Sequence, residues 1–149
     1  MTTAPAVPEP ANIQEFNQIA ALVFAQLYKA FPDLVNINRP AIAVAMGAEE
    51  QNWNSYVLAS GRSAQAVISL TVGWLASEGY TKFFGDHPAD RVMLTTRGLA
   101  AMNAMPSGLG QTVGTALVRA TQGDAFDRSK IGDLIGGVIA GIAKQIGGG

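Results

Sequence analysis

The sequence predicts a mainly helical protein with one small β-hairpin and a glycine-rich C-terminal helix. Apolar residues recur at three- and four-residue steps through several segments, two short β-prone runs flank a turn-forming stretch, and glycines recur through the last segment. We expect residues 1–11 to form a disordered proline-rich arm, residues 12–105 to form the domain that holds the hairpin, and residues 106–149 to form a C-terminal helical extension.

Composition limits the functions that this chain can carry. Of its 149 residues 48% are hydrophobic and 14% are charged, and it has no cysteine and one histidine. Disulfides, thiolate metal sites and histidine clusters are therefore excluded, and we expect no metal and no cofactor. The formal net charge of -1 gives no overall attraction for nucleic acid, so DNA binding would need a local basic patch. The N-terminus lacks a basic start followed by an apolar run, which predicts a cytoplasmic protein.

The first helix is expected over residues 12–31, where apolar residues fall on one face. Asn12 can cap its first turn, and Glu15, three residues later, can reach back to the Asn12 amide, which is a capping-box arrangement. Pro32 then ends the helix, because proline cannot continue the hydrogen-bond pattern.

Three shorter pieces are expected next. Residues 34–37 read as an extended piece, and a short helix follows that Pro40 can begin and Gly47 can end. The segment after it has no clear periodicity, so we predict a loop or helical turn that carries Trp53 and Tyr56. Aromatic residues in such a segment are candidates for contact with a protein partner.

A second long helix is predicted from Ser63, a good cap residue, to Ser77. Its apolar residues recur at helical steps, and this register assigns Trp74 to the core. The runs "YTKFF" and "RVMLT" flank "GDHPAD", which predicts a hairpin whose acidic residues and His87 form a turn and not a catalytic or metal site.

Two further helices are expected after the hairpin. One starts at Thr95 or Thr96 and is broken by Pro106, and the next starts at about Leu109, where apolar residues recur one turn apart. The glycines in "GLGQTVG" do not match a phosphate-binding loop in their spacing, and we interpret them as a helix start with close packing.

The order helix, strand, helix, helix, hairpin, helix resembles the winged helix-turn-helix superfamily. The residues that carry the resemblance are "VGWLASEGYTKFF" and "VMLTTRGLAAM", and "LTTRG" looks like the start of the helix after the wing in bacterial regulators of the MarR and PadR types. The resemblance covers roughly residues 12–105. It implies a winged-helix-like domain with a recognition helix over 63–77, a preceding helix over 40–46 and a wing over 83–92.

DNA binding is one function that this resemblance implies. Cations at the start of the recognition helix and around the wing could neutralise phosphates, and a glutamine could reach a base edge. The helix itself has no lysine or arginine, and the same cations could be surface residues paired with nearby carboxylates. The candidate nucleic-acid contacts are Arg62, Ser63, Gln65, Lys82, Arg91 and Arg97.

The last segment predicts an assembly helix, with isoleucines on one face and small residues on another, so that a second backbone can come close. Self-association is the favoured interpretation, and packing within one chain is the alternative. The apolar stretch is shorter than the roughly 20 residues that span a bilayer. The candidate self-association residues are Ile131, Gly132, Ile135, Gly136, Val138, Ala140, Ile142 and Ile146.

These observations favour a non-enzymatic interaction module that forms homodimers through its C-terminal helix. Its wing and the segment with Trp53 and Tyr56 would contact a protein partner. No catalytic motif is present in the sequence. The first alternative is a dimeric DNA-binding transcriptional regulator, and the second is a protein attached to the membrane surface.

Overall fold

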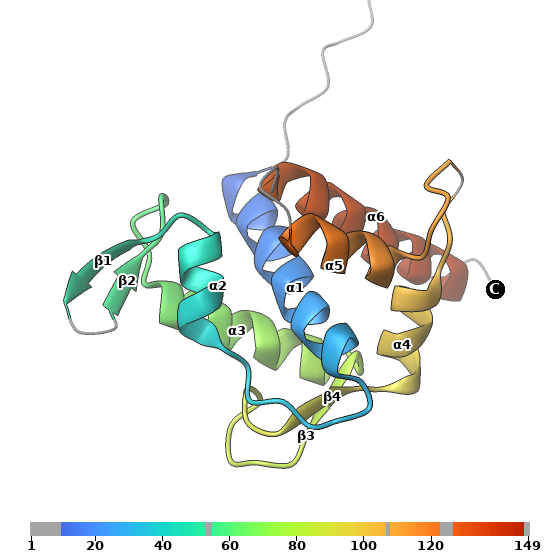
Figure 1. The fold of residues 1–149 in the computed structure, drawn as a ribbon, viewed down its shortest axis with the longest axis horizontal. Coiled ribbons are helices and arrows are strands. Elements are labelled where there is room, and N and C mark those ends of the chain that lie inside the picture. The colour runs from blue at the N-terminus through green and yellow to red at the C-terminus, as the bar shows by residue number, and fades with distance from the viewer. Residues whose placement is uncertain (1–9, 53–54, 107, 123–126, 148–149) are drawn as a thin grey trace, which may run out of the picture.

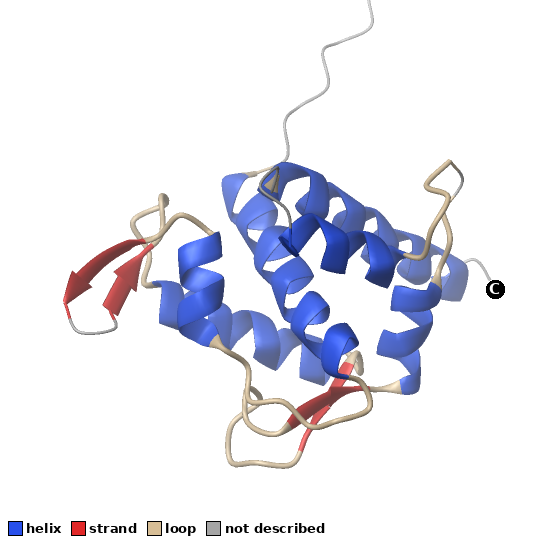
Figure 2. Ribbon diagram, in the orientation of Figure 1, coloured by secondary structure: helices blue, strands red, loops and turns tan. Residues whose placement is uncertain are grey.

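The computed structural model of the protein describes residues 10–52, 55–106, 108–122 and 127–147, with side chains described up to residue 141 in the last of these. These residues form six helices and two antiparallel sheets of two strands each (Figure 1). The prediction of a mainly helical protein with a small hairpin is confirmed, and a second hairpin is added to it. Figure 2 shows that both sheets lie at the periphery of the helical body.

Helix α1 (Ala11–Ala30) is the central element, and the other helices pack around it (Figure 1). Every residue from Ile19 to Ala25 is at most 6% exposed. A helix that is apolar on all sides can be stable in water only when it is covered on all sides. The hydrophobic core therefore surrounds α1 and includes residues from α2 to α6.

The predicted capping box at the start of α1 is wrong. The helix begins one position earlier, with Pro10 as the N-cap, and the Pro10 carbonyl accepts hydrogen bonds from the amides of Ile13 and Gln14 at 3.0 and 3.1 Å. Asn12 consequently lies inside the first turn and cannot cap it. Glu15 consequently does not act in a capping box.

Helix α2 (Arg39–Ala45) forms where a short helix was predicted. The Asn38 side chain caps it by accepting a hydrogen bond from the Ala41 amide at 3.0 Å. Gly47, with a φ of 72°, ends it, since glycine adopts this left-handed conformation without steric cost.

A β-hairpin follows α2, where a loop or helical turn was predicted. Strands β1 (Glu49–Asn52) and β2 (Ser55–Val57) pair with Glu50 opposite Tyr56. All residues of β1 are exposed, so this strand has no apolar alternation from which it could be predicted. The hairpin projects from the helical body (Figure 1).

Helix α3 (Ala64–Ser77) begins as predicted at Ser63, whose hydroxyl accepts a hydrogen bond from the Ala66 amide at 3.4 Å. It leads into the predicted hairpin of β3 (Thr81–Phe83) and β4 (Val92–Leu94).

The extended piece predicted over 34–37 joins this second hairpin. Val35 exchanges backbone hydrogen bonds of 2.8 and 2.9 Å with Val92, and the Ile37 amide donates to the Ala89 carbonyl at 2.9 Å. The chain after α1 is thus held along β4, on the side opposite β3.

Helix α4 (Thr96–Asn103) is joined to the end of α3 through Thr95. The Thr95 hydroxyl accepts a hydrogen bond from the Gly98 amide at 3.1 Å and donates one to the Gly79 carbonyl, while the Thr95 amide donates to the Tyr80 carbonyl at 3.1 Å. Gly98 lies so close to Tyr80 that an added Cβ would be 2.1 Å from the Tyr80 carbonyl oxygen.

Helix α5 (Val113–Gln122) begins later than the predicted start at about Leu109. Gly108 and Gly110 have φ angles of 82° and 72°, which form turns and are incompatible with a right-handed helix. Close packing comes instead from Gly114, where an added Cβ would lie 2.7 Å from the Tyr28 ring.

Helix α6 (Arg128–Gly147) runs along α1 (Figure 1). Ile131 and Ile135 are buried in the same core cluster as the residues of α1. The C-terminal extension therefore shares one hydrophobic core with the preceding residues. Within the described part of the chain, every helix is too short or too polar to cross a lipid bilayer.

Replacing Gly98 with alanine is expected to lower the free energy of unfolding by about 1–3 kcal/mol, because the new methyl group would overlap the Tyr80 carbonyl. The control is Gly137→Ala in α6, where no atom lies within 4 Å of the added Cβ. This control should be neutral or stabilising by up to about 1 kcal/mol, since alanine favours helix. Urea denaturation measures both, and equal effects would contradict the close approach at Gly98.

Candidate functional site

The exposed side of α3 carries two large apolar side chains. The side facing the core buries residues such as Ile68 and Leu75 completely. On the other side Leu70 is 63% exposed, and Trp74, one turn later, is 37% exposed. The assignment of Trp74 to the core is therefore wrong, because helical spacing does not distinguish the centre of a buried face from its edge.

Trp74 is held in a fixed position by other aromatic rings. It packs edge to face against Phe16 of α1, with 5.1 Å between ring centroids and 84° between ring planes. It also stacks on Tyr80 at 6.1 Å, and Tyr80 packs against Phe24 at 6.0 Å. Such pairs stabilise the arrangement beyond simple area burial. The indole thus presents a rigid apolar surface to solvent.

Small side chains lie beside these two large ones. Residues 66, 73 and 77 follow the helical spacing of Leu70 and are Ala, Gly and Ser. No atom lies within 4 Å of a Cβ added to Gly73, so the space above this glycine is open. We call the surface made by Ala66, Leu70, Gly73, Trp74 and Ser77 the α3 face.

No charged residue occurs anywhere in the sequence of α3. The α3 face can therefore approach another apolar surface without desolvating a charge on this helix. Leu70 was not singled out from the sequence. It lies three residues after Val67 and four before Trp74, so helical spacing places it next to the core face and gives no signal that it is exposed.

The six predicted nucleic-acid contacts fall into three groups. Ser63 and Gln65 serve the fold, because the Ser63 hydroxyl caps α3 and the Gln65 side chain accepts a hydrogen bond from the Tyr56 amide at 3.4 Å. Arg62, Lys82 and Arg91 are exposed. Arg62 precedes α3, whereas the other two belong to the β3–β4 hairpin that follows it, so these cations lie at opposite ends of the helix.

Arg97, the sixth predicted contact, is half-buried and packs on the core. Its guanidinium carbon lies 4.7 Å from the centroid of the Tyr80 ring, and Nη2 is 3.4 Å from the Tyr80 hydroxyl. Arg97 thus covers the aromatic cluster from the side of α4.

The cations of the hairpin have local contacts of their own. Lys82 lies over the Phe84 ring at 5.2 Å. Arg91 has a φ of 52°, and its amide donates to the Asn36 side chain at 2.9 Å, which holds the backbone in this conformation. In the turn, His87 Nδ1 accepts a hydrogen bond from the Ala89 amide at 3.0 Å, as a turn-forming residue does.

The predicted partner contacts belong to the β1–β2 hairpin. Tyr56 is half-buried and packs against the core, opposite Glu50 of β1. Trp53 lies outside the described residues.

The predicted self-association residues at the start of α6 pack within the chain. Ile131 and Ile135 are 2% and 0% exposed, and Cβ atoms added to Gly132 and Gly136 would lie 2.8 Å from the side chains of Gln18 and Asn17. The backbone that the glycines approach is α1. Val138 is half-buried and Ala140 is exposed, while the side chains of Ile142 and Ile146 lie outside the described residues.

Comparisons with protein-family models, with curated proteins and with solved structures found nothing that matches this chain. The winged-helix resemblance therefore stays a prediction. In the described residues, no group of three acidic or histidine side chains gathers as a metal ion would require.

Replacing Arg97 with alanine is expected to lower the free energy of unfolding by about 1–2 kcal/mol, because the guanidinium and its stem cover the Tyr80 ring. The matched control is Arg62→Ala, a change at an exposed cation, which should stay within about 0.5 kcal/mol of the unaltered protein. Thermal or urea unfolding measures both variants. If the two changes cost the same, Arg97 does not serve the fold as these contacts indicate.

Proposed function

We propose that this protein is a non-enzymatic interaction module that self-associates through the α3 face. The observation that carries the proposal is the exposure of Leu70 and Trp74 on a helix without a charged residue. Exposed apolar surface of this kind marks interaction sites on soluble proteins. Tryptophan is also enriched among the residues that dominate binding energy, and Trp74 is held rigidly by Phe16 and Tyr80.

A second copy of the chain fits the α3 face because the face is complementary to itself. Leu70 and Trp74 form a ridge, and the small residues Ala66, Gly73 and Ser77 form a shallow strip beside it. Around a two-fold axis, the ridge of one helix can lie over the strip of the other. Two such helices would bring no like charges together.

This proposal moves the self-association contact from α6 to α3. Ile131 and Ile135 are buried against the rest of their own chain, so they are not available to a second copy. The same burial weakens the proposal of attachment to a membrane surface, since the isoleucine face of α6 would have to leave the core.

We also interpret α2, α3 and the β3–β4 hairpin as a winged-helix-like scaffold. The pairing of Val35 with Val92 supports this interpretation, because it adds a third extended segment beside the hairpin. The β1–β2 hairpin lengthens the connection between α2 and α3 beyond a short turn. In this scaffold α3 would take the recognition-helix position, with an apolar surface where a DNA reader has polar groups.

DNA binding is the second candidate, supported by the exposed cations Arg62, Lys82 and Arg91. These side chains could neutralise phosphates at the two ends of α3. The α3 face between them supplies one hydroxyl and no cation, which favours the first proposal.

Changing Leu70 to glutamate is expected to abolish self-association, because two buried carboxylates would face each other near the two-fold axis. The matched control is Val44→Glu on α2, since Val44 is 62% exposed and Leu70 is 63% exposed. Sedimentation equilibrium over a range of concentrations should give a dimer for the unaltered protein and for the control, and a monomer for Leu70→Glu. A monomeric unaltered protein, or a fully dimeric Leu70→Glu, would contradict the proposal.

Duplex DNA of mixed sequence is expected not to bind this protein at physiological salt, because the α3 face has no cation to neutralise phosphate. Fluorescence anisotropy of the labelled duplex, from low to physiological salt, measures this. Binding that weakens steeply with salt and is lost when Lys82 and Arg91 are changed to alanine would contradict this expectation. It would support DNA binding as a function of the protein.

A further inference from the structure

The two ends of α3 carry side chains of opposite charge. Arg62 precedes the Ser63 cap at the start of the helix, and Glu78 is the C-cap at its end. Both side chains are exposed, and neither makes a hydrogen bond or an ion pair with the residues that the structure describes. Because α3 itself has no charged residue, the α3 face is an uncharged surface with a cation beyond one end and a carboxylate beyond the other.

The signs of these two charges are the reverse of those that stabilise an isolated helix. A helix carries partial positive charge at its N-terminus and partial negative charge at its C-terminus, so Arg62 and Glu78 each stand at the end that disfavours them. A second helix that runs in the opposite direction would place its C-terminus beside Arg62 and its N-terminus beside Glu78. Both charges would then be favoured by the neighbouring helix.

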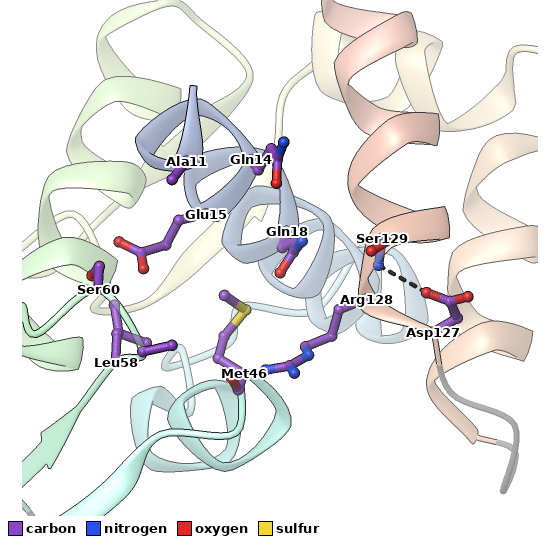
Figure 3. Close-up of a pocket in the computed structure, with 11 residues that line it drawn as sticks. Ala11, Gln14, Glu15, Gln18, Met46, Leu58, Ser60, Asp127, Arg128 and Ser129 are labelled. Atoms are coloured by element: carbon purple, nitrogen blue, oxygen red, sulfur yellow. Dashed lines mark hydrogen bonds between the residues drawn. The ribbon is translucent and has the colours of Figure 1, made fainter. Parts of the chain in front are cut away.

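The backbone that carries each charge is held in place. The Leu58 amide donates a hydrogen bond to the Arg62 carbonyl at 2.9 Å, and Leu58 is only 3% exposed. Figure 3 shows the Leu58 side chain directed towards Met46, at the edge of a cavity of about 700 Å³ beside the first turns of α1. At the other end, the Glu78 amide donates to the Trp74 carbonyl at 2.9 Å. The two charged side chains therefore start from defined positions relative to the α3 face.

Leu70 lies midway between the two charges. It follows Arg62 by eight residues and precedes Glu78 by eight, which is about 12 Å in each direction at the rise of an α-helix. Trp74 lies four residues after Leu70, and Ala66 lies four residues before it. A two-fold axis that crosses α3 at Leu70 therefore brings a large side chain against a small one and a cation against a carboxylate, on both sides of the axis.

We propose that two copies of this chain pack their α3 helices antiparallel around Leu70, with Arg62 of each copy paired to Glu78 of the other. This arrangement rests on the self-association proposed above, and it adds an orientation and a register to it. A guanidinium and a carboxylate form charge-assisted hydrogen bonds, so the two pairs close the apolar contact at both ends. Exposed pairs contribute little affinity, and their main effect is to select one arrangement of the two helices.

The α3 face has room for this packing. Trp74 of each copy lies over Ala66 of the other. Leu70 of each copy packs beside Gly73 of the other, where no atom of the same chain lies within 4 Å of an added Cβ. At the crossing angle of about 20° that is common between packed helices, the ends of the two helices diverge by only about 4 Å over this length. The long side chain of Arg62 can span such a gap.

Other arrangements of the two helices lose these pairs. Parallel packing around a two-fold axis places each residue opposite its own counterpart, so Arg62 meets Arg62 and Glu78 meets Glu78. Like charges that face each other are destabilising. An antiparallel shift by one turn in either direction separates Arg62 from Glu78, and the shift that moves Leu70 onto Trp74 also brings two large side chains together. The register around Leu70 satisfies charge and size at once.

Charge reversal in the full chain tests this arrangement, with sedimentation equilibrium at low salt as the measurement. Arg62→Glu and Glu78→Arg should each weaken self-association by about tenfold or more, since each replaces two attractive pairs with two like-charge contacts. The variant with both changes restores the pairs with their charges exchanged, and its dissociation constant should return to within about threefold of that of the unaltered protein. An equimolar mixture of the two single variants, one of them fluorescently labelled, should form heterodimers.

The matched controls are Lys130→Glu and Glu50→Arg, which change the net charge by the same amounts at exposed positions outside the α3 face. Each should dimerise like the unaltered protein, and their mixture should not favour heterodimers. Circular dichroism checks that all variants fold.

The possible outcomes separate this arrangement from the self-association on which it rests. A monomeric unaltered protein would contradict both. If the unaltered protein is a dimer and Arg62→Glu dimerises as strongly, or if the variant with both changes is as weak as the single variants, the antiparallel register is overturned. Self-association through the α3 face would then still stand.

Discussion

Burial of α1 on all sides is the constraint on which the rest of the fold depends. From Ile19 to Ala25 the helix has no polar side chain, so every direction around it needs an apolar neighbour. α3 covers it on one side, and α5 and α6 cover it on the other (Figure 1). Glycines make the second of these approaches possible, because side chains at Gly114 or Gly132 would collide with residues of α1.

The same constraint explains why α3 has an unusual surface. α3 must be apolar on the side that covers α1, and nothing in the packing of the residues that the structure describes requires it to be apolar on the opposite side as well. Leu70 stands on that opposite side, and Trp74 stands at its edge, where Phe16 and Tyr80 hold it. The proposed contact between two copies supplies a reason for both side chains.

The elements that could be predicted from the sequence are those with a local chemical signal. Ser63 accepts the hydrogen bond that a helix start needs, and the turn residues between β3 and β4 favour a hairpin. β1 had no such signal, because all its residues are exposed and polar and its strand is defined by backbone pairing alone. The start of α1 was misplaced because Asn12 and Glu15 match a capping pattern that the Pro10 carbonyl makes unnecessary.

The candidate sites were harder to predict because each depends on residues distant in sequence. The glycines of α6 indicated the close approach of a backbone, yet their spacing carries no information on which backbone it would be. Arg97 was predicted to be a surface cation because Tyr80, on which it packs, is 17 residues away in the sequence.

The position of α1 at the centre of the fold also has a consequence for synthesis of the chain. α1 leaves the ribosome before α6, against which it packs most extensively and which starts only at Arg128. At usual rates of elongation the apolar surface of α1 stays uncovered by α6 for on the order of ten seconds. During this interval the uncovered hydrophobic surface of α1 can bind chaperones or neighbouring chains. The core around α1 therefore closes only after α6 has been made.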